Sequence, residues 1–334
     1  MMGRQRFLKV LLIASLLLAA VLYGHIRTGF TGLSDGQLLE VLLGGGDEAL
    51  RTTVIDFRLL RALIALLIGA GLGLAGAVFQ TISRNELASP SLLGVNAGAG
   101  LGVMLLIYIT NLDTALPIWA LPLVAILGAT AAAALIYRLS YRKGRVLSPQ
   151  TLVLTGISLA AGIHAIQMLL IVRLDPNKFH IINTWIIGSI AGNSWSHLAF
   201  LAPVVGILGF ILLARYMDLN ILSLADETAI GLGLRINRAR FCYLMLAVIL
   251  AACCVAIGGN ISFVGLIAPH IARRLVGADH AYSLPITALS GAILVVAADW
   301  FGRAIMAPDE ILLGIVVAMI GAPYFLYILA KTKA

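Results

Sequence analysis

Apolar stretches of about 20 residues recur along this chain from end to end, and only short polar segments separate them. A helix needs roughly 20 mostly apolar residues to cross a hydrocarbon core of about 30 Å. The 334 residues are 61% hydrophobic and 11% charged, with a mean hydropathy of +1.02, which leaves too few polar residues to cover a soluble core. The sequence therefore predicts an all-α integral membrane protein, a bundle of transmembrane helices.

The apolar stretches predict ten transmembrane helices. They lie at about residues 7–26, 61–83, 91–109, 117–138, 149–172, 197–215, 240–257, 262–276, 284–303 and 312–330. The first follows basic residues and has no clean small-x-small cleavage site after it, so we interpret it as a retained helix rather than a signal peptide. The longest polar segments, 28–58 and 216–240, are too short to fold alone. We therefore expect one transmembrane domain over residues 1–334.

Basic residues are distributed unevenly between the two sides of the predicted helices. With the amino terminus inside the cell, 16 of the 23 Lys and Arg residues fall on the inner side and seven on the outer side. The outer seven are Arg27, Arg51, Arg58, Arg61, Arg173, Lys178 and Arg303. Because an excess of Lys and Arg in cytoplasmic loops orients helices, we expect both termini in the cytoplasm. Topology then accounts for the net charge of +8, and nucleic-acid binding is not needed to explain it.

Glycine is frequent, with 34 residues, and several glycines lie inside the predicted helices four residues apart. Gly69 and Gly73 form one such pair, and Gly98 and Gly102 form another. Small residues at this spacing let two helix backbones approach closely where lipid supplies no hydrophobic driving force. We therefore expect tight contacts between helices at both pairs.

The chain lacks the motifs of several enzyme classes. It contains no Walker-type glycine loop ending in Gly-Lys-Ser/Thr, no His-Glu-x-x-His and no Gly-x-Ser-x-Gly. Its cysteines, Cys242, Cys253 and Cys254, fit neither a disulfide framework nor a zinc site. We therefore predict that this chain is not an enzyme and binds no cofactor or metal.

Two ionisable residues inside predicted helices keep an ion-coupled secondary transporter open as an alternative. An ionisable group inside a bilayer is costly and is usually kept for function. Asp299 lies four residues before Arg303, where a local ion pair competes with a role as a proton relay. His164 is either a hydrogen-bonded packing residue or a ligand. If neither residue takes up energy, a partner protein must supply it.

The predicted cytoplasmic segment at about residues 216–239 is too short and too polar to cross a membrane. It nevertheless combines apolar, acidic and glycine residues, namely Leu224, Asp226, Glu227, Ile230, Gly231, Gly233 and Leu234. A short helix that docks into a groove on another protein would use such a mixture. A loop that packs on its own bundle would use it equally well, so the residues alone leave both interpretations open.

Several segments, in order along nearly the whole chain, resemble one family. They are Arg58-Leu-Leu-Arg61, Gly76-Ala-Val-Phe-Gln80, Arg84-Asn-Glu-Leu-Ala-Ser-Pro90, Phe263-Val-Gly-Leu-Ile-Ala-Pro269-His270, Ala298-Asp299-Trp-Phe-Gly-Arg303 and Gly321-Ala-Pro323. These segments are similar to those of the FecCD-type permeases, which are the membrane subunits of ABC importers for ferric siderophores, haem and cobalamin.

The resemblance implies a ten-helix permease subunit of the bacterial inner or plasma membrane, with several partners. These are a second permease subunit, identical or different, two cytoplasmic ATPase subunits that bind the ATP and Mg, and an extracytoplasmic substrate-binding protein. The segment at about residues 216–239 matches the family's coupling helices, which sit in the ATPase cleft, so the resemblance favours docking on a partner. A ferric siderophore ranks first as the expected substrate, ahead of haem and cobalamin.

The resemblance also assigns an outer docking site. Arg58, Arg61 and Arg303 match the family's outward arginines, which pair with acidic residues of the binding protein. Guanidinium suits this role because it binds carboxylate in a bidentate geometry and keeps its charge. The alternative is that these arginines contact lipid headgroups or pair locally with Asp56 and Asp299.

The resemblance also implies a cytoplasmic gate at the start of the fifth predicted helix. Relatives carry small hydroxyl residues there, which narrow the exit to the cytoplasm. This chain has Ser148, Pro149 and Gln150 at those positions, which departs from the family pattern.

Overall fold

The computed structural model of this chain describes residues 2–29, 32–91, 94–110, 117, 119–141 and 147–332. All regular secondary structure in these ranges is helical, and every predicted transmembrane helix forms. The corresponding helices are α1 Met2–Arg27, α4 Leu60–Ser83, α5 Val95–Ile109, α6 Ala120–Ser140, α7 Pro149–Ile171, α9 Trp195–Ala214, α12 Ile236–Gly258, α13 Val264–Val276, α14 His280–Ile305 and α15 Leu313–Thr332. Shorter helices connect them, namely α2 Asp35–Leu42, α3 Glu48–Arg51, η1 Thr52–Leu59, α8 Pro176–Ile187, α10 Tyr216–Ser223 and α11 Asp226–Gly231.

Eight helices among the described residues are long and apolar enough to cross a membrane. The other two predicted spans, α5 with 15 residues and α13 with 13, are shorter than a full crossing. Both begin directly after a residue in the left-handed region, since Gly94 has φ 79° and Phe263 has φ 66°. Gly94 adopts this conformation readily because it lacks a Cβ, whereas Phe263 adopts it at a cost. The predicted helical membrane bundle is confirmed, and it includes these two short members.

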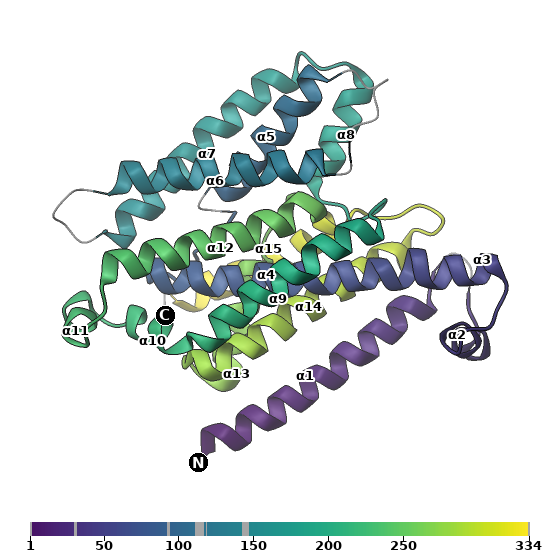
Figure 1. The fold of residues 1–334 in the computed structure, drawn as a ribbon, viewed down its shortest axis with the longest axis horizontal. Coiled ribbons are helices and arrows are strands. Elements are labelled where there is room, and N and C mark those ends of the chain that lie inside the picture. The colour runs from purple at the N-terminus through teal and green to yellow at the C-terminus, as the bar shows by residue number, and fades with distance from the viewer. Residues whose placement is uncertain are drawn as a thin grey trace.

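Helix α4 runs through the middle of the bundle, where it packs against α12 and α14 (Figure 1). Most of its side chains are buried. A Cβ added at Gly69 would collide with the backbone carbonyl of Gly291 in α14, and one at Gly76 would collide with that of Gly265 in α13. The helix backbones are therefore in contact along α4, as the spacing of Gly69 and Gly73 predicts.

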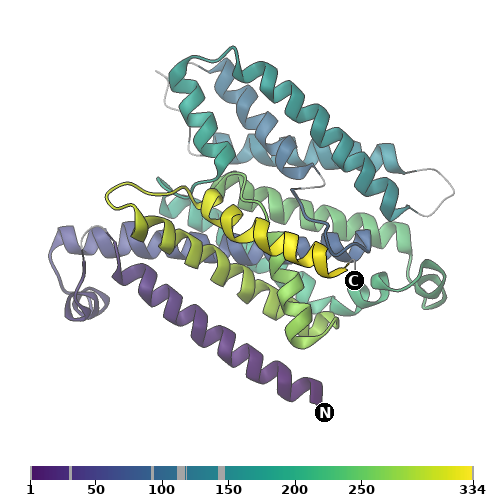
Figure 2. The ribbon, with the colours of Figure 1, turned by 180° about the vertical axis from the view of Figure 1, so that it is seen from behind.

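The second glycine pair joins α5 to α6. A Cβ at Gly98 would collide with the carbonyl of Gly128, and one at Gly102 would lie 2.6 Å from the carbonyl oxygen of Val124. Helices α5, α6 and α7 form a group along one edge of the bundle, and α1 lies along the opposite edge (Figure 1). Seen from behind, α15 lies over α14 (Figure 2).

The two ends of the bundle carry different short helices. Helices α2 and α3 lie at one end, which we call the α2–α3 end (Figures 1 and 2). Helices α10 and α11 lie at the other, which we call the α10–α11 end. The N-terminal end of α1 and the C-terminal end of α15 both lie toward the α10–α11 end.

Much of the polar segment expected at residues 28–58 is helical. Helices α3, η1 and α4 form one continuous helix of 36 residues from Glu48 to Ser83. The π-helical turns of η1 rotate the later residues around the helix axis. Arg58, near the end of η1, reaches the C-terminal end of α1, where it binds backbone carbonyls.

Candidate functional site

At the α2–α3 end, two of the three predicted docking arginines surround Asp299 of α14. The Arg61 guanidinium donates to both oxygens of the Asp299 carboxylate at 2.8 to 3.1 Å, in a bidentate geometry. The Nη1 of Arg61 also lies 2.7 Å from Oε2 of Glu310. Arg303, one helical turn after Asp299, places its Nε 3.4 Å from Oδ2 of the same carboxylate. The expected local ion pair of Asp299 therefore exists and has a second arginine.

Helix α1 completes this arrangement, which we call the outer arginine cluster: Arg58, Arg61, Arg303, Asp299, Glu310 and His25. The Nε2 of His25 lies 2.8 Å from Oδ2 of Asp299, and Arg303 donates to the His25 carbonyl at 3.1 Å. Arg58 donates to the carbonyls of Ile26 and Arg27 at 3.0 and 2.9 Å. An arginine in this position satisfies carbonyls that the end of a helix leaves unpaired.

Burial distinguishes this cluster from a simple surface patch. The Asp299 side chain is 1% exposed, and Arg58 is 5% exposed. Asp56, the other suggested local partner, instead accepts a hydrogen bond from the indole N–H of Trp195 at 2.7 Å. The three arginines are thus brought together as the topology requires, and each binds groups of its own chain.

At the α10–α11 end, Asp226 holds α11 to the bundle. Its Oδ1 lies 2.5 Å from Nη2 of Arg84, at the end of α4, and 2.7 Å from Nη2 of Arg240 in α12. Arg84 also donates to the carbonyl of Leu224, and it adopts the left-handed conformation with φ 47° as the C-cap of α4. The carboxylate of Asp226 therefore joins α11 to the two central helices α4 and α12.

The ionisation of Asp226 fits this role. Partial burial opposes the charged form, but the hydrogen bond and charge of Arg240, together with the charge of Arg84, outweigh burial and lower the pKa of Asp226 below its ordinary value. Because the pKa is lower in the folded state, the ionised carboxylate stabilises the fold at a pH above the ordinary carboxyl pKa. This stability is lost as the pH falls through the lowered pKa.

Helix α10 is held by a separate set of hydrogen bonds. The side-chain amide of Asn220 donates to Asp279 at 2.8 Å, and its carbonyl oxygen accepts from the His280 backbone N–H at 2.9 Å. The Nε2 of the His280 ring lies 2.8 Å from the Thr81 hydroxyl in α4. Both short helices of the segment at residues 216–239 are therefore attached to the bundle.

The outward face of α11 differs from its attached face. Ile230 is 52% exposed and Leu232 is 60% exposed, and Leu224 and Glu227 are also exposed. Ala229, by contrast, is fully buried. The sequence-predicted residues of this segment therefore fall into an anchor, Asp226, and an exposed surface.

The two glycines of the segment also differ, although both are exposed. A Cβ added at Gly231 would meet no atom within 4 Å, and its φ is not in the left-handed region. Gly233 has φ 85°, a conformation that other residues adopt at a cost. Leu234, the last predicted residue, is half-buried and packs against the core.

The sequence matches the FecCD transport family over residues 12–331. The chain belongs to the FecCD transport family. Its curated relatives include two permease proteins of Bacillus subtilis (strain 168). One is the iron(3+)-hydroxamate import system permease protein FhuG, 39% identical over 97% of each chain. The other is the Fe(3+)-citrate import system permease protein YfmE, 40% identical over 98% of this chain and 96% of the relative.

A solved structure and a further relative place this FecCD member in the same class. The structure is of a metal-chelate type ABC transporter in an inward-facing conformation, with a TM-score of 0.86 and 34% identity over 97% of this chain and 99% of the other. The ferric enterobactin transport system permease protein FepG of Escherichia coli (strain K12) is 33% identical over 98% of this chain and 97% of its own length. The chain is therefore a multi-pass membrane protein of an iron-chelate ABC permease family.

The expected gate residues of this FecCD protein start α7. Ser148 is the N-cap, with its Oγ 3.5 Å from the Thr151 nitrogen. Pro149 occupies the first turn, where a backbone N–H would have no acceptor within the helix. The residue before them, Leu147, donates its N–H to Asn237 at 3.0 Å and accepts from Arg240 at 2.7 Å. Arg240 therefore binds both Asp226 of α11 and the backbone directly before the expected gate.

The sequence did not indicate that Arg84, Arg240 and Asn220 attach the segment at residues 216–239 to the bundle. In the sequence, Arg84 is part of a family motif, and Arg240 is one basic residue of the inner side among many. Their partners are far along the chain, 142 residues from Arg84 to Asp226 and 93 from Arg240 to Leu147, so no local periodicity indicates the pairing. The basic residues Arg142, Lys143, Arg145 and Lys333, also counted on the inner side, lie outside the described residues.

The other intramembrane candidate, His164, bonds to a neighbouring residue of its own helix. Its Nδ1 lies 2.8 Å from Oε1 of Gln167 one turn away, and Gln167 donates to the Ala97 carbonyl of α5 at 3.2 Å. Across the described ranges of the chain, no three His, Cys, Asp or Glu residues come together as a metal site would require. His164 is therefore an exposed residue that bonds within α7 to Gln167, and Gln167 makes the contact with α5.

Proposed function

We propose that this FecCD protein is the membrane-spanning subunit of an ATP-driven importer, which moves a ferric siderophore from an extracytoplasmic binding protein into the cytoplasm. The observation that carries the proposal is the attachment of α11. Asp226 is held between Arg84 and Arg240, and Ile230 and Leu232 are exposed on the other face. A helix that is anchored on one face and apolar on the other can pass the movement of a partner to the bundle as a rigid body.

The proposed partners follow from this assignment. A second permease subunit, identical or different, forms the path with this chain, and two cytoplasmic ATPase subunits bind ATP and Mg. The α10–α11 end docks into the ATPases. Because Arg240 binds both Asp226 and the Leu147 carbonyl, displacement of α11 is passed to the start of α7, and we assign Ser148, Pro149 and Gln150 to the cytoplasmic gate.

At the opposite end, we propose that the outer arginine cluster receives the binding protein. Its three arginines outnumber its two carboxylates, Asp299 and Glu310, so with a neutral His25 the cluster carries one net positive charge. Asp299 is buried, but the Glu310 side chain is partly exposed, so the Arg61–Glu310 ion pair is the part that a partner's carboxylate can reach. Charges at such a rim steer association and set the register of docking.

The proposed orientation puts both termini in the cytoplasm. Labelling of single cysteines in a Cys242→Ala background tests it, because Cys242 is exposed and Cys253 and Cys254 are buried. A cysteine at the exposed Arg173 should react with a membrane-impermeant maleimide from outside, and one at the exposed Lys331 only from inside. Reaction with the opposite sidedness would overturn the orientation.

Reconstitution tests the function itself. The chain, its partner permease and the ATPases are placed in proteoliposomes, and uptake of a ferric hydroxamate, haem or cobalamin from the binding protein is measured. We expect uptake of the ferric hydroxamate that requires ATP and survives collapse of the ion gradients. Uptake of haem or cobalamin instead would correct the substrate, whereas uptake that needs an ion gradient and no ATP would contradict the importer class.

A further inference from the structure

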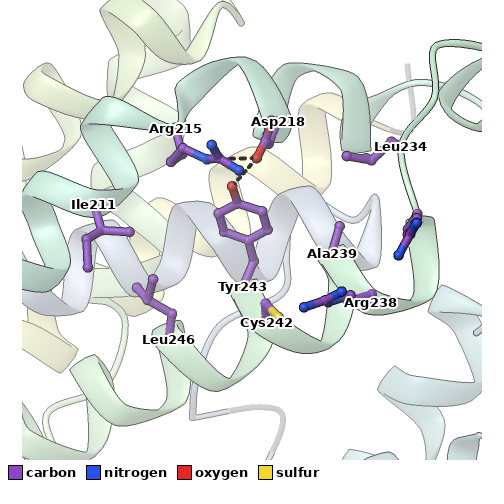
Figure 3. Close-up of a pocket in the computed structure, with 10 residues that line it drawn as sticks. Ile211, Arg215, Asp218, Leu234, Arg238, Ala239, Cys242, Tyr243 and Leu246 are labelled. Carbon is purple, nitrogen blue, oxygen red and sulfur yellow. Dashed lines mark hydrogen bonds and ion pairs between the residues drawn. The ribbon is translucent and has the colours of Figure 1, made fainter.

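A pocket of about 300 Å³ lies at the α10–α11 end, between the last turn of α9, helix α10 and the first turns of α12. Three arginines line it, Arg215, Arg235 and Arg238, above an apolar floor that includes Ile211 and Leu246. Figure 3 shows Tyr243 in its centre, with the hydroxyl directed to Arg215 and Asp218, and with Ile211 and Leu246 on one side and Arg238 on the other. None of these residues belongs to the Asp226 anchor or to the proposed gate.

The charge of the pocket is not balanced. Asp218 is its one carboxylate, and that group accepts from Arg215 at 3.1 Å and from the Tyr243 hydroxyl at 2.6 Å. Arg235 and Arg238 are exposed and make no ion pair or side-chain hydrogen bond with any residue that the structure describes. Helix α12 begins here with no acidic residue in its first turn, so its positive N-terminal end adds to the excess. Two arginines and a helix end are available to an anion.

The apolar side of the pocket continues into the membrane-spanning part of the bundle. Phe210, one residue before the pocket on α9, is 70% exposed, and Ile207 one turn further along is also exposed. Ile249, further along α12, is also an exposed apolar residue. Helices α9 and α12 both have the length and composition of membrane spans. A phospholipid joins a charged headgroup to apolar acyl chains. The basic pocket at the end of two spans, with apolar surface beside it, is complementary to that arrangement.

We propose that this pocket binds the phosphate headgroup of an anionic phospholipid, with Arg235 and Arg238 on the phosphate and the acyl chains along the exposed face of α9. Basic pockets between transmembrane helices on the cytoplasmic side recognise such headgroups. The inference goes beyond the importer function, because it needs only that α9 and α12 span a membrane. Asp218 belongs to α10, so a bound headgroup lies against the same segment that carries α11.

Lipid binding to the purified full-length chain tests the proposal. Native mass spectrometry in detergent compares added phosphatidylglycerol, phosphatidylcholine and inorganic phosphate. The variant is Arg235→Gln with Arg238→Gln, and the matched control is Arg51→Gln with Arg173→Gln, two exposed arginines toward the opposite end. Because each arginine near an anionic lipid contributes about 1 kcal/mol, we expect the variant to bind phosphatidylglycerol about 30-fold more weakly, with the control unchanged.

Each other outcome decides against the proposal. Equal binding of phosphatidylglycerol and phosphatidylcholine would leave the pocket without headgroup selectivity. Displacement of phosphatidylglycerol by millimolar inorganic phosphate would make it a site for free anions, and loss of bound lipid when the ATPases assemble would make it a protein interface. Gel filtration of each variant checks folding, and if the double variant aggregates, Arg238→Gln alone is expected to show about fivefold weaker binding.

Discussion

The two ends of α4 hold their charged residues in different ways. At the α2–α3 end, the arginines assigned to docking are the same residues that neutralise the buried Asp299 and bind the end of α1. At the α10–α11 end, the anchor and the proposed contact surface are separate, because Asp226 binds the bundle and Ile230 and Leu232 face outward. Function and stability are therefore coupled at the first end and separable at the second. Reversing the charge of Arg58 and Arg61 would disturb both properties together.

The largest effect is expected from Asp299→Asn. Removing this charge leaves Arg61 and Arg303 without their shared, buried counter-ion, which costs about 3–5 kcal/mol of the free energy of unfolding when a buried pair is broken. Thermal unfolding in detergent should show a large loss of stability or a loss of folded protein. Asp309→Asn, at an exposed neighbouring acid, is the control and should change the free energy by less than about 0.5 kcal/mol. Equal stability of both variants would mean that the cluster is not structural.

Two adjacent acids test whether the α10–α11 end separates anchor from surface. Asp226→Lys places a third positive charge beside Arg84 and Arg240, and we expect a loss of about 1–3 kcal/mol in the free energy of unfolding. Glu227→Lys makes the same charge change one residue later on an exposed position, so it should alter unfolding by less than about 0.5 kcal/mol. If thermal unfolding is the same for the two variants, Asp226 does not anchor α11.

Gly231 and Gly233, at the α10–α11 end, should also differ in their effect on unfolding when they are replaced, by a smaller amount. Gly233→Leu forces a branched residue into φ 85°, which costs about 1–2 kcal/mol. Gly231→Leu adds its side chain into open space and should leave the unfolding temperature unchanged. Hydrogen exchange of residues 216–239 should therefore become faster only in Gly233→Leu. Faster exchange in both variants would contradict the local geometry.

The smallest effect is expected at the α2–α3 end from Glu310→Gln. This change frees Nη1 of Arg61 from its partly exposed ion pair with Glu310 while the bond to Asp299 remains. Because an exposed ion pair is worth about 0.2–1 kcal/mol, the affinity for the binding protein should rise by at most about fivefold at low salt. The control is Asp309→Asn, which removes the same charge without touching Arg61. The gain in affinity of Glu310→Gln should vanish at high salt. An equal gain in both variants would assign it to general electrostatics.

The helices were predictable from the sequence, whereas most of the contacts of the site were not. Long apolar stretches indicate the spans, and Gly69, Gly73, Gly98 and Gly102 indicate where backbones touch. The short helix α8 was missed because its 12 residues mix polar and apolar side chains without a clear period. The pairing of Arg61 with Asp299 joins residues 238 apart, so only the folded chain reveals it.

The separation of anchor from surface at the α10–α11 end is tested most directly by uncoupling. Ile230→Glu with Leu232→Glu changes only exposed residues, and Leu39→Glu, an exposed apolar residue at the opposite end, is the control. In proteoliposomes with the full complex, ferric hydroxamate uptake per ATP hydrolysed is measured together with the unfolding temperature. We predict at least a roughly tenfold fall in uptake per ATP for the double variant, with unfolding unchanged and the control normal. Normal uptake per ATP in the double variant would contradict the assignment of this surface to the ATPases.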